Sequence, residues 1–275
     1  MGEFTFIAND GCPLHAVAVD FDCEGGTANE DLIVVLFHGG GPDHRMFLPL
    51  ARSLGDSYRV MLPDVRGYGR SVCSKPSCHN WDRYVGDAIA LLDHLGVRRA
   101  IIGGGGLGTT IALRTALAYR ERVHSLVLIS VEDIEDDEAK RTEVAFLDAF
   151  AERVRVEGIE AAWAPILQDF APIIGELVRE AIPRSDPSSI AAAAAIGRDR
   201  SFRSADELAA INVPTLIIPG NDARHPTALA QNLARILPQG RLASVALIAD
   251  LLTADDLAKA FAPAIREFLR NTRNS

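Results

Sequence analysis

Short runs of consecutive apolar residues recur along this chain, and segments with helical periodicity separate them. The runs occupy residues 32–37, 59–62, 100–102, 125–129, 215–218 and, last, 242–249. A continuous apolar run is typical of a strand that is buried on both faces of a sheet. The segments between them place apolar side chains at three- and four-residue spacing, as residues 84–95 do. Strands that alternate with helices predict an α/β fold, with a mainly parallel central sheet and helices on both of its faces.

The first residues follow a different pattern. Residues 1–22 alternate polar and apolar side chains on either side of the turn sequence NDG at 9–11. Alternation predicts half-buried strands, and such a turn favours a tight connection between them. We therefore expect a β-hairpin at the start of the chain, followed by a glycine-rich turn near Gly25.

A long segment late in the chain lacks any convincing strand. Residues 132–207 contain only helical patterns rich in Ala, Glu and Arg, including an alanine run at 190–196 that strongly favours a helix. We expect residues 132–205 to form a helical cap or lid above the carboxyl ends of the strands. The core domain is then made of residues 1–131 and 206–275.

Composition limits the partners and the compartment. The net charge of −9, without a basic run, argues against nucleic acid, because phosphate neutralisation needs clustered Lys and Arg. No window approaches the ~20 apolar residues of a membrane helix, and no secretion signal is evident. Scattered Cys12, Cys23, Cys73 and Cys78 lack the paired spacing of a metal site. We expect a cytoplasmic protein with reduced thiols, no cofactor, no metal and a small-molecule ligand or substrate.

Sequence motifs follow several of the predicted strands. The first motif is FHGGGP at 37–42, directly after an apolar run, and the second is DVRGYGRS at 64–71. A glycine-rich turn, GGGLG at 104–108, leads from one run into a helix, and VPTLIIPGND at 213–222 ends another run in an aspartate. In this order and spacing the motifs resemble those of the α/β-hydrolase superfamily. The resemblance implies that fold, an oxyanion loop at 37–42 and a nucleophile turn at 104–108.

The resemblance assigns the three catalytic positions of that superfamily to Gly106, Asp222 and Asp250. Serine hydrolysis needs a hydroxyl that a histidine activates and an acid that orients the histidine. Here only the acid, Asp222, keeps its residue type, and no histidine follows His225. We expect ordinary acyl-serine chemistry to be absent. Gly106→Ser alone should then create no esterase, whereas Gly106→Ser together with Asp250→His could restore a trace.

The same turn can be interpreted without a nucleophile. Gly103, Gly105 and Gly108 match a dinucleotide fingerprint, but the position is about 100 residues later than expected, so a tight strand-to-helix crossing is the simpler interpretation. Glycine at 106 relieves the strain of such a turn and opens space at a helix N-terminus. We expect Gly40, Gly41 and Leu107 to offer backbone N–H groups to an oxyanion or ligand.

Polar side chains near this turn are the remaining candidates. His38 and His225 are candidates, with Asp222, for handling a proton or positioning water, although a packed role for His38 and a helix-capping role for His225 are both open. His44 and Arg45, in the loop after the oxyanion motif, are candidate ligand contacts. Either a solvated or a substrate-facing position suits that loop.

Three classes of function remain open at this stage. The first is a non-classical hydrolase- or lyase-like enzyme that acts on a small carbonyl compound without an acyl-serine. The second is an inactive hydrolase homologue that binds a small, partly apolar ligand, which would stabilise the protein without turnover. The third is a structural or partner-binding role, for which the sequence offers no exposed apolar repeat or charge stripe.

Overall fold

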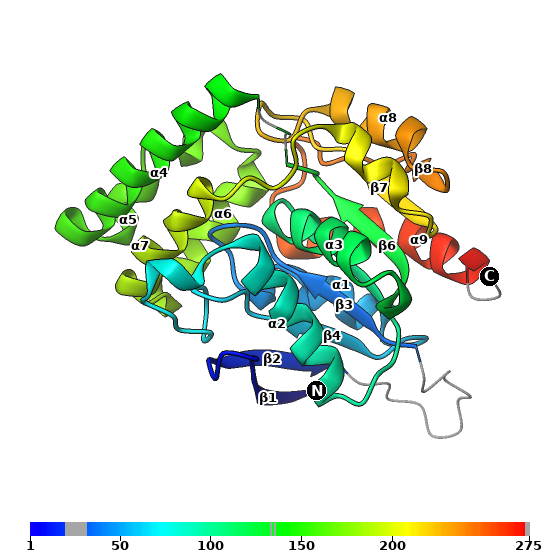
Figure 1. The fold of residues 1–275 in the computed structure, drawn as a ribbon. Helices are drawn as coiled ribbons and strands as arrows, with labels where there is room; N and C mark the ends of the chain where they lie inside the picture. Colours follow the sequence, from blue (N-terminus) through cyan, green and yellow to red (C-terminus); the bar gives the residue numbers. More distant parts are fainter. Residues whose placement is uncertain (20–31, 133, 135, 273–275) are drawn as a thin grey trace.

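A computed structural model describes residues 1–19, 32–132, 134 and 136–272 of the 275-residue chain. Its core is a single sheet in the order β1-β2-β4-β3-β5-β6-β7-β8 (Figure 1). The strands are β1 (Gly2–Ile7), β2 (Pro13–Val19), β3 (Val34–Phe37), β4 (Val60–Pro63), β5 (Ala100–Gly105), β6 (Val123–Ile129), β7 (Thr215–Ile218) and β8 (Gly240–Leu242). From β4 to β8 neighbouring strands run parallel, which confirms the α/β prediction.

The predicted N-terminal hairpin is confirmed. Strands β1 and β2 pair in antiparallel register, and β2 continues the sheet by pairing antiparallel with β4. The turn between them uses Gly11 at φ 83°, a conformation that suits glycine. The turn predicted near Gly25 and the thiol of Cys23 lie outside the described residues.

Helices cover both faces of the sheet. One face carries α2 (Trp81–His94), α3 (Leu107–Ala118) and α8 (Thr227–Ile236). The other face carries α1 (Leu48–Leu54) and the last helix, α9 (Ala254–Thr272). Strand residues alternate between the two hydrophobic clusters: Ile102 and Leu128 belong to the first, Ile101 and Ile129 to the second. The core strands are therefore apolar on both sides, as their continuous runs indicated.

The last predicted strand was wrong in position. Strand β8 spans Gly240–Leu242, whereas most of the apolar stretch at 242–249 is irregular. This stretch keeps two backbone bonds to the sheet, from Ala243 N to Ile217 O (2.8 Å) and from Leu247 N to Pro219 O (2.9 Å). Leu247 in this stretch is buried in the same hydrophobic cluster as α9. From the sequence alone, an apolar residue that packs against a helix cannot be distinguished from one in a buried strand.

Between β6 and β7 the described chain contains helices and no strand, as expected for this segment. The helices are α4 (Asp137–Glu157), α5 (Ile159–Trp163), α6 (Pro172–Ala181) and α7 (Pro187–Ala193). They lie together at one end of the sheet (Figure 1), and α4, α5 and α7 share a small hydrophobic cluster around Phe150 and Ile190. The alanine run forms α7 and a following 3-10 turn.

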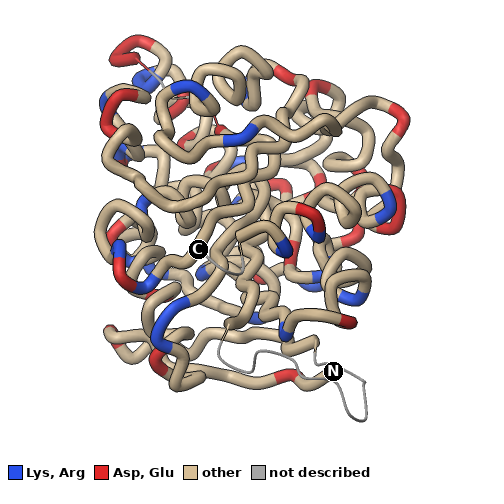
Figure 2. Tube along the Cα trace, turned by 90° about the vertical axis from the view of Figure 1, so that its right-hand side faces the viewer, with Lys and Arg blue, Asp and Glu red and all other residues tan. Residues whose placement is uncertain are grey.

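Lys and Arg positions are interspersed with Asp and Glu positions along the described trace (Figure 2). On α4, for example, Arg153 lies 3.4 Å from Glu157 and Arg155 lies 3.1 Å from Glu152. Such exposed pairs contribute little to stability and mainly keep a surface solvated. Among the described residues, no helix combines the length and apolar character needed to cross a membrane.

Candidate active site

The turn between β5 and α3 has Gly106 at its apex, in a backbone conformation that suits glycine. Gly106 adopts φ 49° and ψ −118°, a region that residues with a Cβ adopt only under strain. Its N–H points to the end of β6, 3.2 Å from the carbonyl oxygens of both Ile129 and Ser130. The geometry of the turn is thus fixed by backbone contacts rather than by a side chain.

The flanking glycines are explained by close backbone approach. A Cβ on Gly104 would lie 2.2 Å from the Phe37 carbonyl oxygen, and a Cβ on Gly108 would lie 2.1 Å from the same atom. No side chain fits at either position, because backbone cannot move away as a flexible side chain can. The glycine run therefore serves a tight crossing of α3 over β3.

Gly106 itself faces open space and a histidine. A Cβ built on Gly106 would lie 3.3 Å from Nε2 of His225 and 3.8 Å from Cα of Gly39, with no other atom of the described residues as near. A hydroxyl carried by a side chain at position 106, or a water in the space that such a side chain would fill, would be within hydrogen-bonding reach of His225. The turn thus holds a small gap in front of an imidazole nitrogen.

His225 is oriented by Asp222 in the loop after β7. Nδ1 of His225 lies 2.8 Å from Oδ1 of Asp222, and the same oxygen accepts the backbone N–H of His225 at 2.9 Å. Burial by itself would raise the pKa of Asp222, but these hydrogen bonds and the imidazole outweigh it and hold the pKa below its usual value. Because a carboxylate only accepts, Nδ1 carries the proton and the Nε2 lone pair faces Gly106.

Backbone donors border the same gap. Leu107 is the first residue of α3, and neither its N–H nor that of Gly40 has a hydrogen-bond acceptor among the described residues. Gly40 and Leu107 both line the pocket in front of Gly106. Free N–H groups at a helix N-terminus favour a developing negative charge. Gly41, by contrast, is absent from the lining; its φ of 104° places it against Trp163 and Val178.

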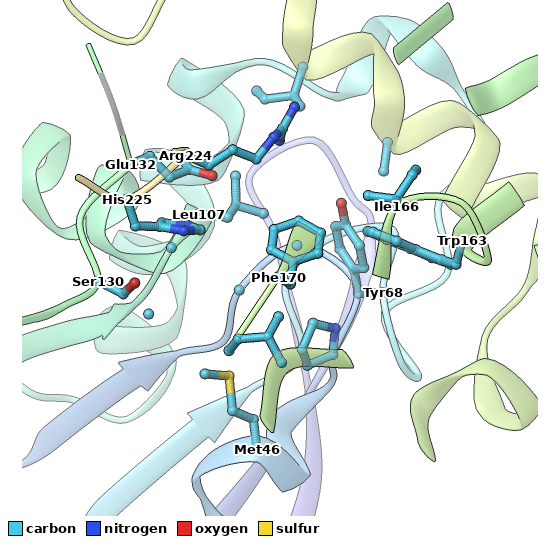
Figure 3. Close-up of a pocket in the computed structure, with 18 of the residues that line it drawn as sticks. Met46, Tyr68, Leu107, Ser130, Glu132, Trp163, Ile166, Phe170, Arg224 and His225 are labelled. Carbon is cyan, nitrogen blue, oxygen red and sulfur yellow. The ribbon is translucent and has the colours of Figure 1, made fainter. Parts of the chain in front are cut away.

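The pocket is small and mostly apolar. Its volume is about 130 Å³, close to the about 150 Å³ of an apolar cavity that binds benzene. Core residues form its floor, and the helices between β6 and β7 supply its aromatic wall: Phe146, Phe150, Trp163 and Phe170. Figure 3 shows Glu132 and His225 on one side of this pocket, with Tyr68, Trp163 and Ile166 on the other.

Two polar residues follow β6 into this pocket. Ser130 has φ 59°, the one positive value among the described residues other than glycine, and its Oγ is buried without a partner. Glu132 accepts a hydrogen bond from Thr110 Oγ1 at 3.0 Å. Burial raises the pKa of Glu132, although the nearby His225 opposes that effect. The pocket therefore contains a carboxyl group in addition to the Asp222–His225 pair.

The chain matches a family model for the alpha/beta hydrolase fold over residues 33–171, about half of its length. It belongs to the α/β-hydrolase family. The eight-stranded sheet with helices on both faces agrees with that assignment. The turn at Gly106 joins a strand to a helix, as the nucleophile elbow of that family does.

Known relatives are hydrolases by name. Over 102 residues the chain is 34% identical to a 2-hydroxymuconate semialdehyde hydrolase from Pseudomonas sp. (strain CF600), which covers 35% of each protein. Over 217 residues it is 27% identical to a pimeloyl-(acyl-carrier protein) methyl ester esterase from Vibrio cholerae, covering 74% of this chain and 82% of the esterase. A malate-bound thermophilic esterase from Thermogutta terrifontis superposes with a TM-score of 0.79 at 27% identity over 99% of each chain. The first curated relatives are matched over only 35% to 45% of their length.

Asp250, to which the resemblance assigned the histidine position, lies outside the pocket lining. Its side chain is exposed in the irregular stretch before α9, and only its neighbours Leu247 and Leu257 reach the pocket. Of the two candidate histidines, His225 is the one whose Nε2 faces Gly106, and it reaches that position from the loop after β7. A turn that bridges Asp222 and His225 folds the imidazole back toward the elbow.

His38, His44 and Arg45 do not line the pocket. His38 is fully buried, with Nδ1 2.7 Å from the Gly39 carbonyl and Nε2 accepting the Val65 N–H at 2.9 Å. Burial lowers the pKa of His38 and keeps it neutral. Arg45 is exposed. The packed interpretation of His38 and the solvated interpretation of Arg45 therefore agree with the structure better than ligand contact does.

His44 instead belongs to a buried network around the second motif. Asp64 accepts from Nδ1 of His44 (2.8 Å), Nδ1 of His15 (3.0 Å) and the backbone N–H groups of His44 and Arg70 (2.9 Å each). The two histidines and Asp64 are the one group in the described chain with the spacing of a metal site. With both carboxylate oxygens and both Nδ1 atoms already engaged, the cluster is a hydrogen-bond hub that joins β2, the end of β4 and the 3-10 turn at His44–Phe47.

Sequence reasoning missed Glu132 and Ser130 as pocket residues. Both follow the carboxyl end of β6, the edge of a parallel sheet at which ligands bind in α/β proteins. Their place just after β6 was therefore a signal that both residues could line a pocket. The sequence analysis overlooked it because Glu132 also begins an acidic run, which is typical of the start of a helix.

Proposed function

We propose that this α/β-hydrolase-family protein is an enzyme that acts on a small carbonyl compound by direct attack of water, without an acyl-serine intermediate. The observation that carries the proposal is the Asp222–His225 pair, whose Nε2 faces the gap left by the missing side chain of Gly106. A base without a protein nucleophile can activate a nucleophile from solvent instead.

The proposed reaction follows from the geometry. A water in the gap above Gly106 gives one proton to Nε2 of His225 while its oxygen attacks the carbonyl carbon. The N–H groups of Gly40 and Leu107 stabilise the resulting oxyanion, and Asp222 stabilises the imidazolium. When the tetrahedral adduct collapses, the proton on His225 passes to the departing alcohol, amine or carbanion, which releases the acid product.

The pocket limits the substrate to a small and largely apolar molecule. A volume of about 130 Å³ and an aromatic wall suit an acyl or aryl group near the size of benzene. The semialdehyde hydrolase and methyl ester esterase named above are relatives whose names imply a carbonyl substrate. We extend only the carbonyl class to this chain.

The test is hydrolysis of p-nitrophenyl acetate by the purified protein. We expect steady release of nitrophenol without an initial burst, and an intact protein mass without an acyl adduct during turnover. His225→Gln should lower the rate 10²- to 10⁴-fold, because it removes the general base. His94→Gln, an exposed histidine stacked on Phe4, is the matched control and should not change the rate. Equal rates in His225→Gln and the unmodified protein would overturn the proposal.

The same apolar pocket favours one other candidate, a ligand-binding protein without turnover. Its specific support is the aromatic wall of Phe146, Phe150, Trp163 and Phe170. Binding alone predicts that acetophenone raises the melting temperature by mass action while p-nitrophenyl acetate is not hydrolysed. Hydrolysis that depends on His225 would exclude that candidate.

A further inference from the structure

We propose that this pocket also catalyses proton transfer at the carbon next to a carbonyl group, with His225 as the base and Glu132 as the second proton-transfer group. The activity would be an isomerase activity, keto–enol tautomerisation. It rests on the proposed Asp222–His225 base but does not require attack by water.

The pocket offers groups that move protons and none that form a covalent bond readily. No cysteine or lysine lines it among the described residues. Ser130 lines the pocket, but its Oγ is buried without a hydrogen-bond partner, so no described base activates it. The polar side chains of the lining are those of Tyr68, Ser130, Glu132, Glu143, Arg224 and His225. A site of this composition suits acid–base chemistry at carbon.

Glu132 differs from the other carboxyl group in the pocket wall. Glu143 is paired with Lys140 at 2.7 Å, whereas Glu132 has no cation within ion-pair distance among the described residues. Its one described side-chain partner is the hydroxyl of Thr110. Figure 3 shows Glu132 beside His225 on the same wall. Burial that raises the pKa of Glu132 favours its protonated form, which can deliver a proton.

The proposed step balances without any further reactant. His225 Nε2 removes a proton from the α-carbon, and the electron pair of that C–H bond forms the enolate. The enolate oxygen accepts from the N–H groups of Gly40 and Leu107, which line the pocket and have no acceptor among the described residues. Glu132 then gives a proton to the oxygen, yielding the enol, or to the carbon, returning the ketone. Solvent later exchanges the protons on His225 and Glu132.

The experiment uses 1-phenylpropan-2-one, a small aryl ketone, with the full chain in D₂O. Loss of the benzylic proton signal in the NMR spectrum reports enolisation. We expect exchange above the buffer rate, a loss of at least 100-fold in His225→Gln and a loss of about 10-fold or more in Glu132→Gln. Glu132→Gln should also remove one limb of the pH–rate profile, which a purely structural role would not. Glu138→Gln, an exposed glutamate at the start of α4, is the matched control.

Ester hydrolysis by the same variants separates the two proposals. Glu138→Gln should retain p-nitrophenyl acetate hydrolysis as well as ketone exchange, because Glu138 is exposed and lies outside the pocket lining. Ester hydrolysis without ketone exchange would overturn the isomerase activity and leave the proposed hydrolase intact. Ketone exchange without ester hydrolysis would overturn the proposed hydrolase and leave the isomerase activity intact. Exchange at the unmodified rate in Glu132→Gln would remove Glu132 from the mechanism.

Discussion

Nε2 of His225 lies 3.3 Å from the point that a Cβ on Gly106 would occupy, although the two residues are more than 100 positions apart in the chain. Asp222 holds the imidazole in this orientation through Nδ1. The turn at Gly106 is thus faced by a histidine that an acid orients, and Gly106 itself offers no hydroxyl. This relationship changes what a single substitution should do.

Gly106→Ser alone should create a covalent serine nucleophile. The new Oγ would lie within reach of His225 Nε2 and next to the N–H groups of Gly40 and Leu107. Serine in a left-handed conformation costs roughly 1–3 kcal/mol of stability, which a folded domain tolerates. We expect a fluorophosphonate probe to label Gly106→Ser at position 106, detected by mass spectrometry. Gly106→Ala has the same strain without the hydroxyl and should remain unlabelled; a folded Gly106→Ser that also stays unlabelled would contradict the orientation of His225.

Asp222→Asn should lower p-nitrophenyl acetate hydrolysis strongly without unfolding the protein. An amide that donates to Nδ1 would force the proton onto Nε2, which then could not act as a base. The corresponding change in a serine protease lowers kcat about 10⁴-fold, so a loss of at least 100-fold is expected here. Steady-state kinetics and a circular dichroism melt measure both effects. Asp250→Asn, at an exposed position outside the pocket lining, should stay within about two-fold of the unmodified rate. A large loss in that variant would support a catalytic role for Asp250, the position that the family resemblance assigned to the histidine.

The buried strands were predictable from sequence because their position depends on local apolar runs, and β3, β6 and β7 lie within two residues of the runs that predicted them. Strand β8 was not, because Leu247 is apolar for packing against α9 rather than for pairing. The direction of His225 depends on a tight turn after β7 that brings residue 225 back over the elbow. Sequence spacing contains no information on that turn, and the family resemblance, which expects the histidine late in the chain, points to Asp250 instead.

Gly108→Ala should destabilise the fold severely, and Gly86→Ala should not. A Cβ on Gly108 would meet the Phe37 carbonyl oxygen at 2.1 Å, so α3 would have to move away from β3. Gly86 lies within α2 with nothing within 4 Å of its Cβ position, so alanine there should add up to about 1 kcal/mol through helix propensity. Urea unfolding measures both variants. A Gly108→Ala protein as stable as the original would show that the crossing of α3 over β3 is looser than described.

Asp64→Asn should destabilise the protein by about 3 kcal/mol or more at neutral pH, because it leaves buried donors without their carboxylate. Burial raises the pKa of Asp64, but the hydrogen bonds from His15 and His44 outweigh this and lower it far below its usual value. A carboxylate with a lowered folded-state pKa stabilises the protein above the unfolded-state value of about 3.9. That contribution falls as the pH drops below this value toward the folded-state pKa.

Urea unfolding should therefore show the full difference in the free energy of unfolding between Asp64→Asn and the unmodified protein from pH 5 to 8, and a smaller difference below about pH 4. Asp169→Asn, at an exposed position, is the control for the loss of one charge. A difference that stays constant down to pH 3 would mean that the charge of Asp64 is not what holds the hub together.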